Sequence, residues 1–332
     1  SRWPADVSVQ GARVAVIGTG ASAIQVVPGI VDDVAHLGVF QRSAPWVLRR
    51  GDRPIRPGTR RLYARLPAVY AGVRAATRVS RELNTPVFTE SSPIGRVIER
   101  MARAHMQSVV TDPALRAKLT PSYRVGCKRI LISDDYYPAL THEHVDVVTD
   151  PIERVSATGV LTRDPKSGAL VEHPVDVMVL ATGFLPSRPP VADKVVGVDG
   201  RTLARLWDAR GVHAYKGTAV PGYPNLFFLV GPNTGLGHTS MLLMIEAQVA
   251  YVAEAVRLVR EGTARRVEVT PAATTAWNDE LQRRLAKSIW ATGGCSSWYV
   301  DEHGRNVTLW PGTTWSFERA VKTFDRDAYL TA

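Results

Sequence analysis

The sequence of 332 residues has only two cysteines, Cys127 and Cys295, and no CxxC pair. Disulfide frameworks and zinc sites are recognised by several cysteines at short spacings, so the sequence predicts neither. Two isolated thiols fit a cytoplasmic location, where cysteines stay reduced. The sequence also lacks an uninterrupted run of about 18 apolar residues, the length that a membrane-spanning helix needs. We therefore expect no membrane partner.

Acidic residues are in the minority, with 31 Asp and Glu against 41 Lys and Arg, which gives a net charge of +10. The basic residues are spread along the chain. Their densest group, residues 49–61, lies in a stretch rich in proline and glycine without a nucleic-acid-binding motif. We expect no nucleic-acid partner, because an anionic cofactor and a solvated surface account for the charge. A nucleic-acid binder would need these cations clustered in space.

The stretch that organises the chain is residues 11–42, GARVAVIGTGASAIQVVPGIVDDVAHLGVFQR. An apolar run at 14–17 predicts a strand, and a second run at 37–40 predicts another. Between them, helical spacing of Ile24, Val27 and Ile30 predicts a helix. The unit of about 30 residues has the size and order of a dinucleotide-binding βαβ motif.

The turn before this helix reads G-x-G-x-x-A, and each position suits a pyrophosphate. Gly18 allows the tight turn, Gly20 lets the phosphates approach the backbone, and Ala23 lets the helix pack close to the strand. The helix N-terminus offers free N–H groups to the phosphates. The residues expected to contact the cofactor here are Gly18, Thr19, Gly20, Ala21, Ser22, Ala23 and Gln25. The alternative is a plain glycine turn.

The residues after the second predicted strand are Gln41 and Arg42. An NAD site usually has Asp or Glu there, which holds the ribose 2′-hydroxyl. Here no carboxylate would repel a 2′-phosphate, and the guanidinium of Arg42 can pair with one. The sequence therefore favours NADPH. The alternative is that Arg42 is an ordinary surface cation.

The rest of the chain alternates between helical and extended patterns. Residues 62–119 have helical spacing divided by Pro86, Pro93 and Pro113, which predicts a helical insertion covering one side of the nucleotide domain. Strands are predicted at 130–132, 145–148, 152–155, 160–162, 175–180 and 226–230. A second glycine-rich loop, residues 231–240, precedes a helix over 241–260 that Thr239 or Ser240 can cap. These patterns predict an α/β protein, and the family resemblance described next implies that its sheets are doubly wound.

Several separate motifs in this order resemble the Baeyer–Villiger monooxygenases, a branch of the flavin-containing monooxygenases. VAVIGTGASAIQ and FQRSAPW resemble the family's NADPH-binding unit, and GCKRILISDDYYPAL resembles its loop with an active-site Lys-Arg pair. VLATGF, PGYPNLFFLVGPNTGLGHTS and SSWY resemble the segments that join the two domains, close over the flavin and fold over the cofactor. The resemblance covers essentially the whole chain.

The resemblance implies two Rossmann-like domains, with the one for FAD incomplete. It implies a first part of the NADPH domain at 1–48, a helical insertion at 49–120, a second part at 121–182 and the C-terminal part of the FAD domain at 183–332. The family fingerprint F-x-G-x-x-x-H-x-x-x-W is matched only at its end, by Trp3, and the family's first G-x-G-x-x-G is not found. The resemblance therefore implies a chain truncated at its N-terminus, whose partner would be the missing FAD-binding segment.

The resemblance also implies an activity and its site residues. NADPH reduces FAD, O2 adds to the flavin at C4a, and the peroxyflavin attacks a ketone to give an ester or lactone. Arg129 would be the catalytic residue, and Lys128 would share the 2′-phosphate of NADPH with Arg42. Further cofactor contacts would come from Ala181, Thr182, Gly183, Asn233, Thr234 and Trp298.

Two other functions fit the same motifs. A flavin monooxygenase acting on nitrogen or sulfur would share them, although the Lys128-Arg129 pair favours ketone oxidation, because that reaction needs the peroxide anion. A non-catalytic NADPH-binding module would also fit, since part of the FAD site is not found in the sequence. Flavin absorbance in the purified chain would argue against the module.

Overall fold

The structure, a computed structural model, describes residues 3–90, 92–185 and 189–332. The chain forms two compact units. Unit 1 comprises Ser1–Arg53, Arg96–Val125 and Arg129–Phe184, and unit 2 comprises Pro54–Gly95, Gly126–Lys128 and Leu185–Ala332. The segment 49–120, which the sequence predicts as one helical insertion, is therefore shared between the units.

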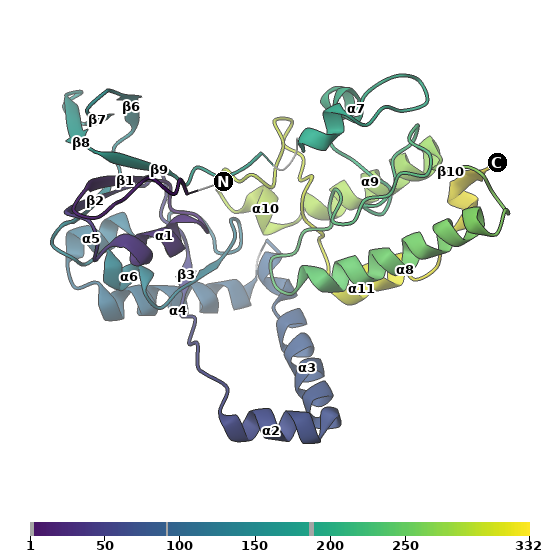
Figure 1. Cartoon of the computed structure of the whole chain (residues 1–332), viewed down its shortest axis with the longest axis horizontal. Coiled ribbons are helices and arrows are strands. Elements are labelled where there is room, and N and C mark those ends of the chain that lie inside the picture. Colours follow the sequence, from purple (N-terminus) through teal and green to yellow (C-terminus); the bar gives the residue numbers. More distant parts are fainter. Residues whose placement is uncertain (1–2, 91, 186–188) are drawn as a thin grey trace. The chain divides into compact units, whose positions relative to one another are not determined.

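Unit 1 is built on a parallel sheet of four strands in the order β5-β2-β1-β9 (Figure 1). The strands are β1 (Arg13–Ile17), β2 (His36–Phe40), β5 (Val145–Val148) and β9 (Val177–Leu180). Helix α1 (Ala23–Ile30) follows β1 and leads to β2, its parallel neighbour. This arrangement confirms the α/β class and the predicted strand–helix–strand unit.

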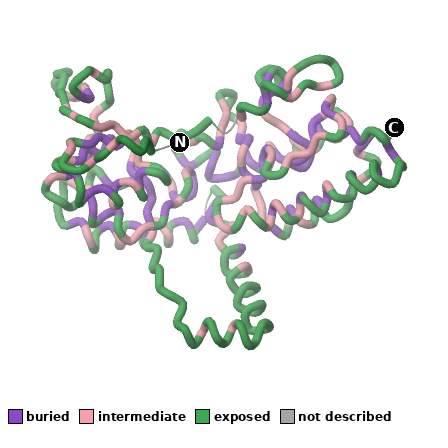
Figure 2. Tube along the Cα trace, viewed as in Figure 1, coloured by how far each residue is buried: buried purple, intermediate pink, exposed green. Residues whose placement is uncertain are grey.

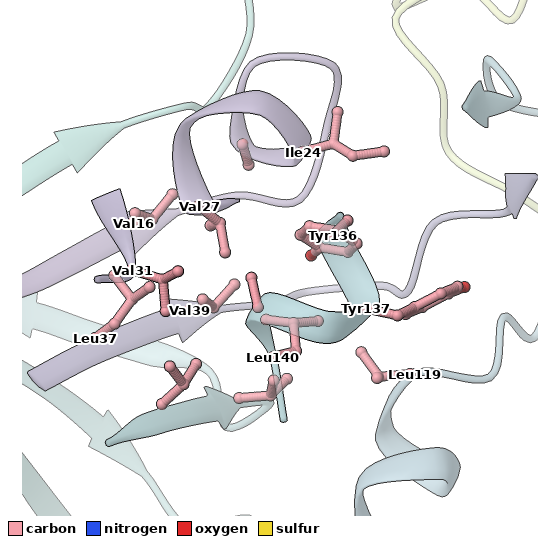
Figure 3. Packing of buried hydrophobic residues seen from close by; sticks show 14 of the residues in the cluster. Val16, Ile24, Val27, Val31, Leu37, Val39, Leu119, Tyr136, Tyr137 and Leu140 are labelled. Atoms are coloured by element: carbon pink, nitrogen blue, oxygen red, sulfur yellow. The ribbon is translucent and has the colours of Figure 1, made fainter. Parts of the chain in front are cut away.

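The core of unit 1 lies between the sheet and two helices, α1 and α6 (Tyr136–Ala139) (Figure 3). Val27 of α1, Leu37 of β2 and Tyr136 of α6 are fully buried there. Apolar side chains at three- and four-residue intervals face the sheet from α1, which is why periodicity predicted this helix. Burial of such side chains stabilises the unit by about 25 cal/mol per Å² of apolar surface.

Other elements of unit 1 lie outside this sheet. Strand β3 (Val47–Leu48) pairs in parallel with β4 (Leu131–Ile132). Strands β6 (Ile152–Val155), β7 (Gly159–Arg163) and β8 (Leu170–Pro174) form a separate antiparallel sheet. Helix α4 (Pro93–Val109), whose first residues up to Gly95 belong to unit 2, and helix α5 (Pro113–Lys118) both begin at a proline. Prolines therefore divide the helical region as predicted, since proline is tolerated in the first turn of a helix.

Unit 2 is mainly helical. Its elements are α2 (Pro57–Arg65), α3 (Pro67–Glu82), η1 (Thr85–Phe88), η2 (Pro190–Asp193), α7 (Leu203–Arg210), α8 (Met241–Arg260), α9 (Pro271–Leu285), α10 (Ile289–Thr292), α11 (Thr314–Val321), η3 (Arg326–Ala328) and the antiparallel pair β10 (Val267–Val269) and β11 (Tyr329–Thr331). Ser240 caps α8 by accepting a bond from the N–H of Leu242, which confirms the predicted start. Helices α2 and α3 are almost wholly exposed (Figure 2), so their apolar faces do not form the buried contact that periodicity suggested.

The predicted strand at 226–230 is wrong, because the structure has no strand there. The N–H of Phe228 donates to the carbonyl of Thr218 at 2.7 Å, and the N–H of Val230 donates to the side-chain oxygen of Gln248 at 2.9 Å. Val230 has a φ of +60°, which is unusual for a β-branched residue and takes the chain out of an extended course. The backbone N–H groups of Phe228 and Val230 thus bond to the carbonyl of Thr218 and to the Gln248 side chain, and not to a neighbouring strand.

The prediction that the cysteines are unpaired is also wrong. Cys127 and Cys295 form a disulfide within unit 2, with their Cα atoms 6.1 Å apart. The bond joins residues 168 positions apart. Closing a loop of that length in the unfolded chain corresponds to roughly 5 kcal/mol in the chain-entropy model. Pairing over such a distance leaves no local pattern in the sequence, which is why spacing arguments missed it.

Two negative findings apply to the residues described above. None of their helices combines the length and apolar character needed to cross a membrane. They also contain no group of three or more His, Cys, Asp or Glu side chains that could hold a metal ion.

Candidate cofactor-binding site

The loop between β1 and α1 is fixed by a close approach of two backbones. Gly18 has a φ of +112°, and a Cβ atom added to it would lie 2.5 Å from the carbonyl oxygen of Ala181. The N–H of Gly18 donates to the carbonyl of Phe40, and the N–H of Ala181 donates to the carbonyl of Ile17. The structure therefore brings together two predicted site segments, the glycine loop and residues 181–183, at the ends of neighbouring strands.

The space around Gly20 differs from that around Gly18. A Cβ atom at Gly20 would meet no atom within 4 Å, so the backbone is open on that side. Among the described residues, no hydrogen bond involves the backbone N–H groups of Ala21, Ser22 or Ala23. Unpaired N–H groups at a helix N-terminus attract anions because they also carry the positive end of the helix dipole. The loop can therefore receive a pyrophosphate.

Thr19 and Gln25, two of the predicted contact residues, use their side chains for hydrogen bonds to backbone carbonyl groups of the protein. The hydroxyl of Thr19 donates to the carbonyl of Ser43 at 3.0 Å. The side-chain amide of Gln25 donates to the carbonyl of Ala21 at 2.6 Å. These bonds hold both ends of the loop, and the Thr19 hydroxyl, which donates to Ser43, can contact a ligand only as an acceptor.

The carboxyl end of β2 carries a buried amide followed by an exposed cation. The Gln41 side chain is buried, and its amide nitrogen donates to the carbonyl of Lys118 at 2.7 Å. Arg42 is exposed, and no hydrogen bond or ion pair of its side chain occurs within the described residues. With an amide where an acidic residue would favour NAD, this edge of unit 1 suits an anion such as a 2′-phosphate.

The Lys-Arg pair falls on the border of the two units. Lys128 is half-buried and belongs to unit 2, whereas Arg129 is exposed and belongs to unit 1. Gly126 has a φ of +89°, and residues 125–128 form turns and bends, so the chain changes direction just before Arg129. The shared role of Lys128 and Arg42 stays a prediction.

The second glycine-rich loop, residues 231–240, is held by its own side chains. Asn233 and Thr234 are both buried. The Asn233 amide donates to the carbonyl of Asn306 at 2.7 Å, and the Thr234 hydroxyl donates to the carbonyl of Gly231 at 2.7 Å. These bonds use the donor groups of both side chains and hold the loop in shape, while the backbone atoms and the acceptor oxygens of the side chains stay chemically able to contact a cofactor.

Phe88 of η1 is a packing residue that sequence reasoning missed. A Cβ atom on Gly126 would lie 3.3 Å from its ring, and one on Gly237 would lie 2.5 Å from it. The ring also stacks on Trp290 at 5.2 Å between centroids. Phe88 thus brings the segment before Lys128 and the loop 231–240 together within unit 2. Its only sequence signal was the glycine at each position that it contacts.

Trp298 lies at the outer end of the same aromatic cluster. Its ring contacts that of Tyr299 at 4.5 Å, and Tyr299 contacts Trp290 at 6.4 Å. Half of Trp298 is exposed. An exposed indole backed by buried rings can stack on a flat ligand, so its predicted role is compatible with this position.

Beside this cluster, two ionisable side chains are almost completely buried. The His238 ring nitrogen Nε2 lies 3.3 Å from a carboxylate oxygen of Glu82. Glu82 also accepts bonds from the backbone N–H and the hydroxyl of Thr314, at the start of α11. Burial lowers the pKa of His238, and the Glu82 carboxylate opposes that shift only in part. Burial thus favours the neutral form of His238, and its Nε2 is placed to donate an N–H to Glu82 when that nitrogen carries the hydrogen.

Comparisons with known proteins agree on one family. No protein-family model matches the chain. The chain is 44% identical to a Baeyer–Villiger monooxygenase of Streptomyces coelicolor, over 99% of this chain and 62% of that protein. A structure of oxidised steroid monooxygenase bound to NADP is 30% identical, with a TM-score of 0.79 over 97% of this chain and 66% of that chain. A structure of OTEMO with FAD and NADP has a TM-score of 0.81 at 22% identity, over 100% of this chain and 69% of that one, and shows the shared fold alone. The chain thus spans about three-fifths of the curated relative.

Proposed function

We propose that this chain, a homologue of Baeyer–Villiger monooxygenases over 99% of its length, is part of an enzyme that uses NADPH, FAD and O2 to convert a ketone into an ester or lactone. The observation that carries the proposal is the 44% identity to a protein of that name. Since the chain spans 62% of that relative, the activity belongs to the whole protein. A ketone substrate and a cytoplasmic location are parts of the same proposal, although the location no longer has the support of reduced cysteines, since Cys127 and Cys295 are bonded to each other.

Unit 1 would bind NADPH. Support comes from the open backbone at Gly20, the free N–H groups that begin α1 and the exposed guanidinium of Arg42. The pyrophosphate would lie at the N-terminus of α1, and Arg42 would pair with the 2′-phosphate. Lys128 would supply a second cation to that phosphate. Residues 181–183, which lie next to Gly18, would contact the cofactor from the side of β9.

FAD, when bound, supplies the oxygen chemistry, and the protein supplies binding and electrostatics. The steroid monooxygenase structure, which is 30% identical to this chain and was solved with NADP, supports the nicotinamide cofactor, whereas FAD is proposed from the 44% identity to the Streptomyces coelicolor enzyme. In this chain the loop 231–240 and Trp298 would contact FAD. Asn233 and Thr234 would keep that loop in shape through the bonds described above.

Arg129 would act on the charge that develops during oxygen transfer. Negative charge builds up on oxygen when an oxygen nucleophile adds to a ketone carbonyl. A guanidinium stays protonated at every relevant pH and offers several donors in a fixed plane. Such a group stabilises developing charge without reorganising during the reaction. Arg129 is exposed in unit 1, so its side chain is available for this role.

Product analysis with the full-length protein tests the proposal. Purified protein with FAD, NADPH and O2 should convert a cyclic ketone into the matching lactone, detected by gas chromatography. A parallel reaction with a thioether should give much less sulfoxide. Sulfoxide or N-oxide without lactone would identify the nitrogen- or sulfur-oxidising alternative. NADPH binding without flavin or oxidation would identify the non-catalytic module.

A further inference from the structure

The disulfide of unit 2 joins two segments that the proposed function assigns to cofactor binding. It connects Cys127, which directly precedes Lys128, to Cys295, which lies three residues before Trp298. All of these residues belong to unit 2. Lys128 is the proposed second cation for the 2′-phosphate of NADPH, and Trp298 is a proposed contact of FAD. The bond therefore lies next to a proposed contact of each cofactor.

Tight packing holds the Cys127 end of this bond. Cys127 is fully buried. A Cβ atom added to Gly293 would lie 2.8 Å from both the Cβ and the sulfur of Cys127, and one added to Gly126 would lie 3.3 Å from the ring of Phe88. Side chains at these two glycines would displace Cys127 or its neighbours. Cys127 is therefore held in place by the surrounding atoms as well as by the disulfide.

The Cys295 end of the bond has few other contacts. Residues 294–298 lie outside every helix and strand. Within the part of the chain that the structure describes, no hydrogen bond involves the backbone of Gly294, Cys295 or Ser296. These residues lead from the end of α10 to Trp298 and to Tyr299, whose ring is buried. The disulfide is thus the main connection between residues 294–296 and the rest of unit 2.

The two sulfur atoms also differ in their access to solvent. Cys127 is fully buried, whereas Cys295 is half-buried and its neighbours Gly294 and Ser296 are exposed. A disulfide is reduced when a thiolate attacks one of its sulfur atoms and the other sulfur leaves. Access therefore favours attack at the sulfur of Cys295, with the sulfur of Cys127 as the leaving group.

We propose that Cys127 and Cys295 form a reversible redox switch that controls how tightly the protein holds FAD, with a dithiol as the reductant. This inference rests on the proposed function, which assigns Trp298 to FAD. One thiolate of the dithiol attacks the Cys295 sulfur and forms a mixed disulfide, while the Cys127 sulfur leaves and takes up a proton. The second thiol of the dithiol then attacks the first, and the Cys295 sulfur leaves and takes up a proton.

The exchange conserves atoms and electrons. Two electrons and two protons pass from the dithiol to the protein, so one disulfide breaks in the protein and one forms in the dithiol. A disulfide compound such as oxidised glutathione reverses the reaction. It accepts two electrons and two protons from the cysteine thiols, becomes two free thiols, and restores the bond between Cys127 and Cys295.

Reduction should loosen the segment that leads to Trp298. Residues 294–296 would lose their main connection to unit 2, so FAD binding would have to order them at a cost in conformational entropy. A segment that is ordered before binding gives a higher affinity, because that cost is absent. Lys128 should stay in place, since Cys127 is held by packing. Reduction should therefore weaken the binding of FAD much more than that of NADPH.

A permanent cross-link that only stabilises the fold is the alternative. It would leave the FAD affinity of the folded protein the same in both oxidation states. Disulfides in cytoplasmic proteins are usually transient, with a catalytic or redox-sensing role. The proposed location therefore favours a switch over a permanent cross-link.

Titration of the full-length apoprotein with FAD, followed by flavin fluorescence, tests the switch. The protein is titrated after oxidation, after reduction with dithiothreitol, and after reoxidation with oxidised glutathione. Reduction should raise the dissociation constant of FAD at least about fivefold, and reoxidation should restore it. The reduced protein should also contain two more titratable thiols. An unchanged dissociation constant, or no gain of thiols in the folded protein, would overturn the proposal.

NADPH binding distinguishes local from global loosening. With FAD at saturation, the dissociation constant of NADPH should change by less than about twofold on reduction. An equal loss of affinity for both cofactors would mean that reduction loosens unit 2 as a whole, and it would overturn the proposal.

Variants of the two segments separate the disulfide from other effects of the reductant. Cys295→Ser cannot form the bond, so it should have the FAD affinity of the reduced protein with or without dithiothreitol. Ser296→Ala keeps both cysteines and is the matched control, which should respond to reduction like wild type. If Cys295→Ser does not fold, wild type that has been reduced and alkylated with iodoacetamide takes its place. FAD affinity equal to that of the oxidised protein in either form would contradict the switch.

Hydrogen exchange gives a readout that does not depend on FAD. The N–H of Val300 donates to the carbonyl of Ser297 at 3.2 Å, and the N–H of Val307 donates to the carbonyl of Tyr299 at 3.1 Å. Both amides should exchange at least about fivefold faster after reduction, whereas the amides of β1 in unit 1 should not change. Unchanged exchange at Val300 and Val307 would overturn the switch. If the protein bound no FAD in either state, the proposed function and the control of FAD would both fail, and faster exchange would show that the bond still holds this segment.

Discussion

Gly18 and Ala181 are in such close backbone contact that no side chain fits between them. A Cβ atom on Gly18 would lie 2.5 Å from the Ala181 carbonyl oxygen, and the φ of Gly18 is +112°. Both effects oppose any substitution, because most residues avoid positive φ and no Cβ tolerates that distance. Gly18 is thus required by the fold of unit 1 before any ligand is considered.

Substitution of Gly18 should damage stability and cofactor binding together. Gly18→Ala should lower the free energy of unfolding by about 1–3 kcal/mol, because it imposes an unfavourable backbone conformation. Chemical denaturation followed by circular dichroism measures that loss, and calorimetry measures NADPH binding.

Gly20→Ala is the matched control, since its Cβ would meet no protein atom within 4 Å. The free energy of unfolding should stay within about 0.5 kcal/mol of wild type. NADPH binding should nevertheless weaken, because the methyl group occupies the side from which the pyrophosphate approaches. Unchanged NADPH binding in Gly20→Ala would show that the phosphates lie elsewhere.

Arg42 should determine the choice between the two nicotinamide cofactors. A charge-assisted hydrogen bond contributes about 1.5–3 kcal/mol, so NADPH should bind at least about tenfold more tightly than NADH. Arg42→Ala should narrow that difference, whereas Arg49→Ala, an exposed arginine of the same unit, should preserve it. Dissociation constants for both cofactors provide the measurement. Equal wild-type constants would contradict the assignment.

The buried pair of His238 and Glu82 should make stability depend on pH. Burial lowers the pKa of His238 below its usual 6.5. Just below pH 6.5, His238 is therefore protonated in more of the unfolded molecules than of the folded ones. Between 6.5 and the lower folded pKa, the free energy of unfolding should therefore fall as pH falls. Arg78, which donates to the Thr314 hydroxyl beside Glu82, and its partner Glu318 are charged groups close to this pair.

Urea titrations at about pH 7.5 and about pH 5.5 measure this effect. In His238→Gln, which keeps an N–H donor but does not titrate, the loss of stability between these two pH values should be smaller than in wild type. An identical loss in both proteins would mean that His238 does not titrate differently on folding.

A second buried charge is Lys216, whose ammonium lies 3.1 Å from a carboxylate oxygen of Asp325. Only 8% of the Lys216 side chain is exposed. Asp325→Asn leaves the buried Lys216 ammonium without its carboxylate partner and should lower the free energy of unfolding, by less than for a fully buried pair because 36% of the Asp325 side chain is exposed and solvent screens the charge. The double change Asp325→Asn with Lys216→Met should recover part of that loss, because no charge stays buried. A double variant less stable than Asp325→Asn would argue against this account.

The pKa of Asp325 supports the same conclusion at low pH. Burial alone raises it, but bonds from Tyr215, Tyr251 and Lys216 outweigh burial and leave the pKa below its usual 3.8. A carboxyl with a lowered pKa stabilises the fold above its unfolded pKa. That contribution should disappear as pH falls from 3.8 through the folded pKa, and Asp325→Asn should lack this part of the acid transition.

Features of the fold could be predicted from the sequence where the residues that determine them lie close together in the chain. The βαβ unit was predicted because the periodicities of β1, α1 and β2 and the turn at Gly18 are all local features. Strand 226–230 was wrong because Val230 and Gln248, 18 residues apart, decide its course. The disulfide was missed for the same reason, since Cys127 and Cys295 meet only in the folded chain.

The candidate site shows the same division. The residue types of Gly18, Gly20 and Arg42 could be interpreted from the chemistry of phosphate binding. Phe88 could not, because its importance comes from contacts with Gly126 and Gly237, which lie far away in the sequence. Helical spacing around Leu62 and Val69 predicted helices correctly but predicted burial wrongly, because an amphipathic pattern does not say whether the protein itself covers the apolar side.

Arg129 should separate oxygen transfer from cofactor oxidation in the full-length enzyme. Its guanidinium would face negative charge that grows on oxygen during attack on the ketone, and loss of one such stabilising group costs about 10²–10³ in rate. Hydride transfer from NADPH localises less charge, so Arg129→Ala should reduce ester formation far more than NADPH oxidation.

Arg129→Lys should recover little of the lost ester formation, because an ammonium lacks the planar arrangement of donors. Arg154→Ala, an exposed arginine of β6, should behave like wild type. Ketone conversion measured beside NADPH consumption gives both rates, and near wild-type ester formation by Arg129→Ala would show that another residue stabilises the charge.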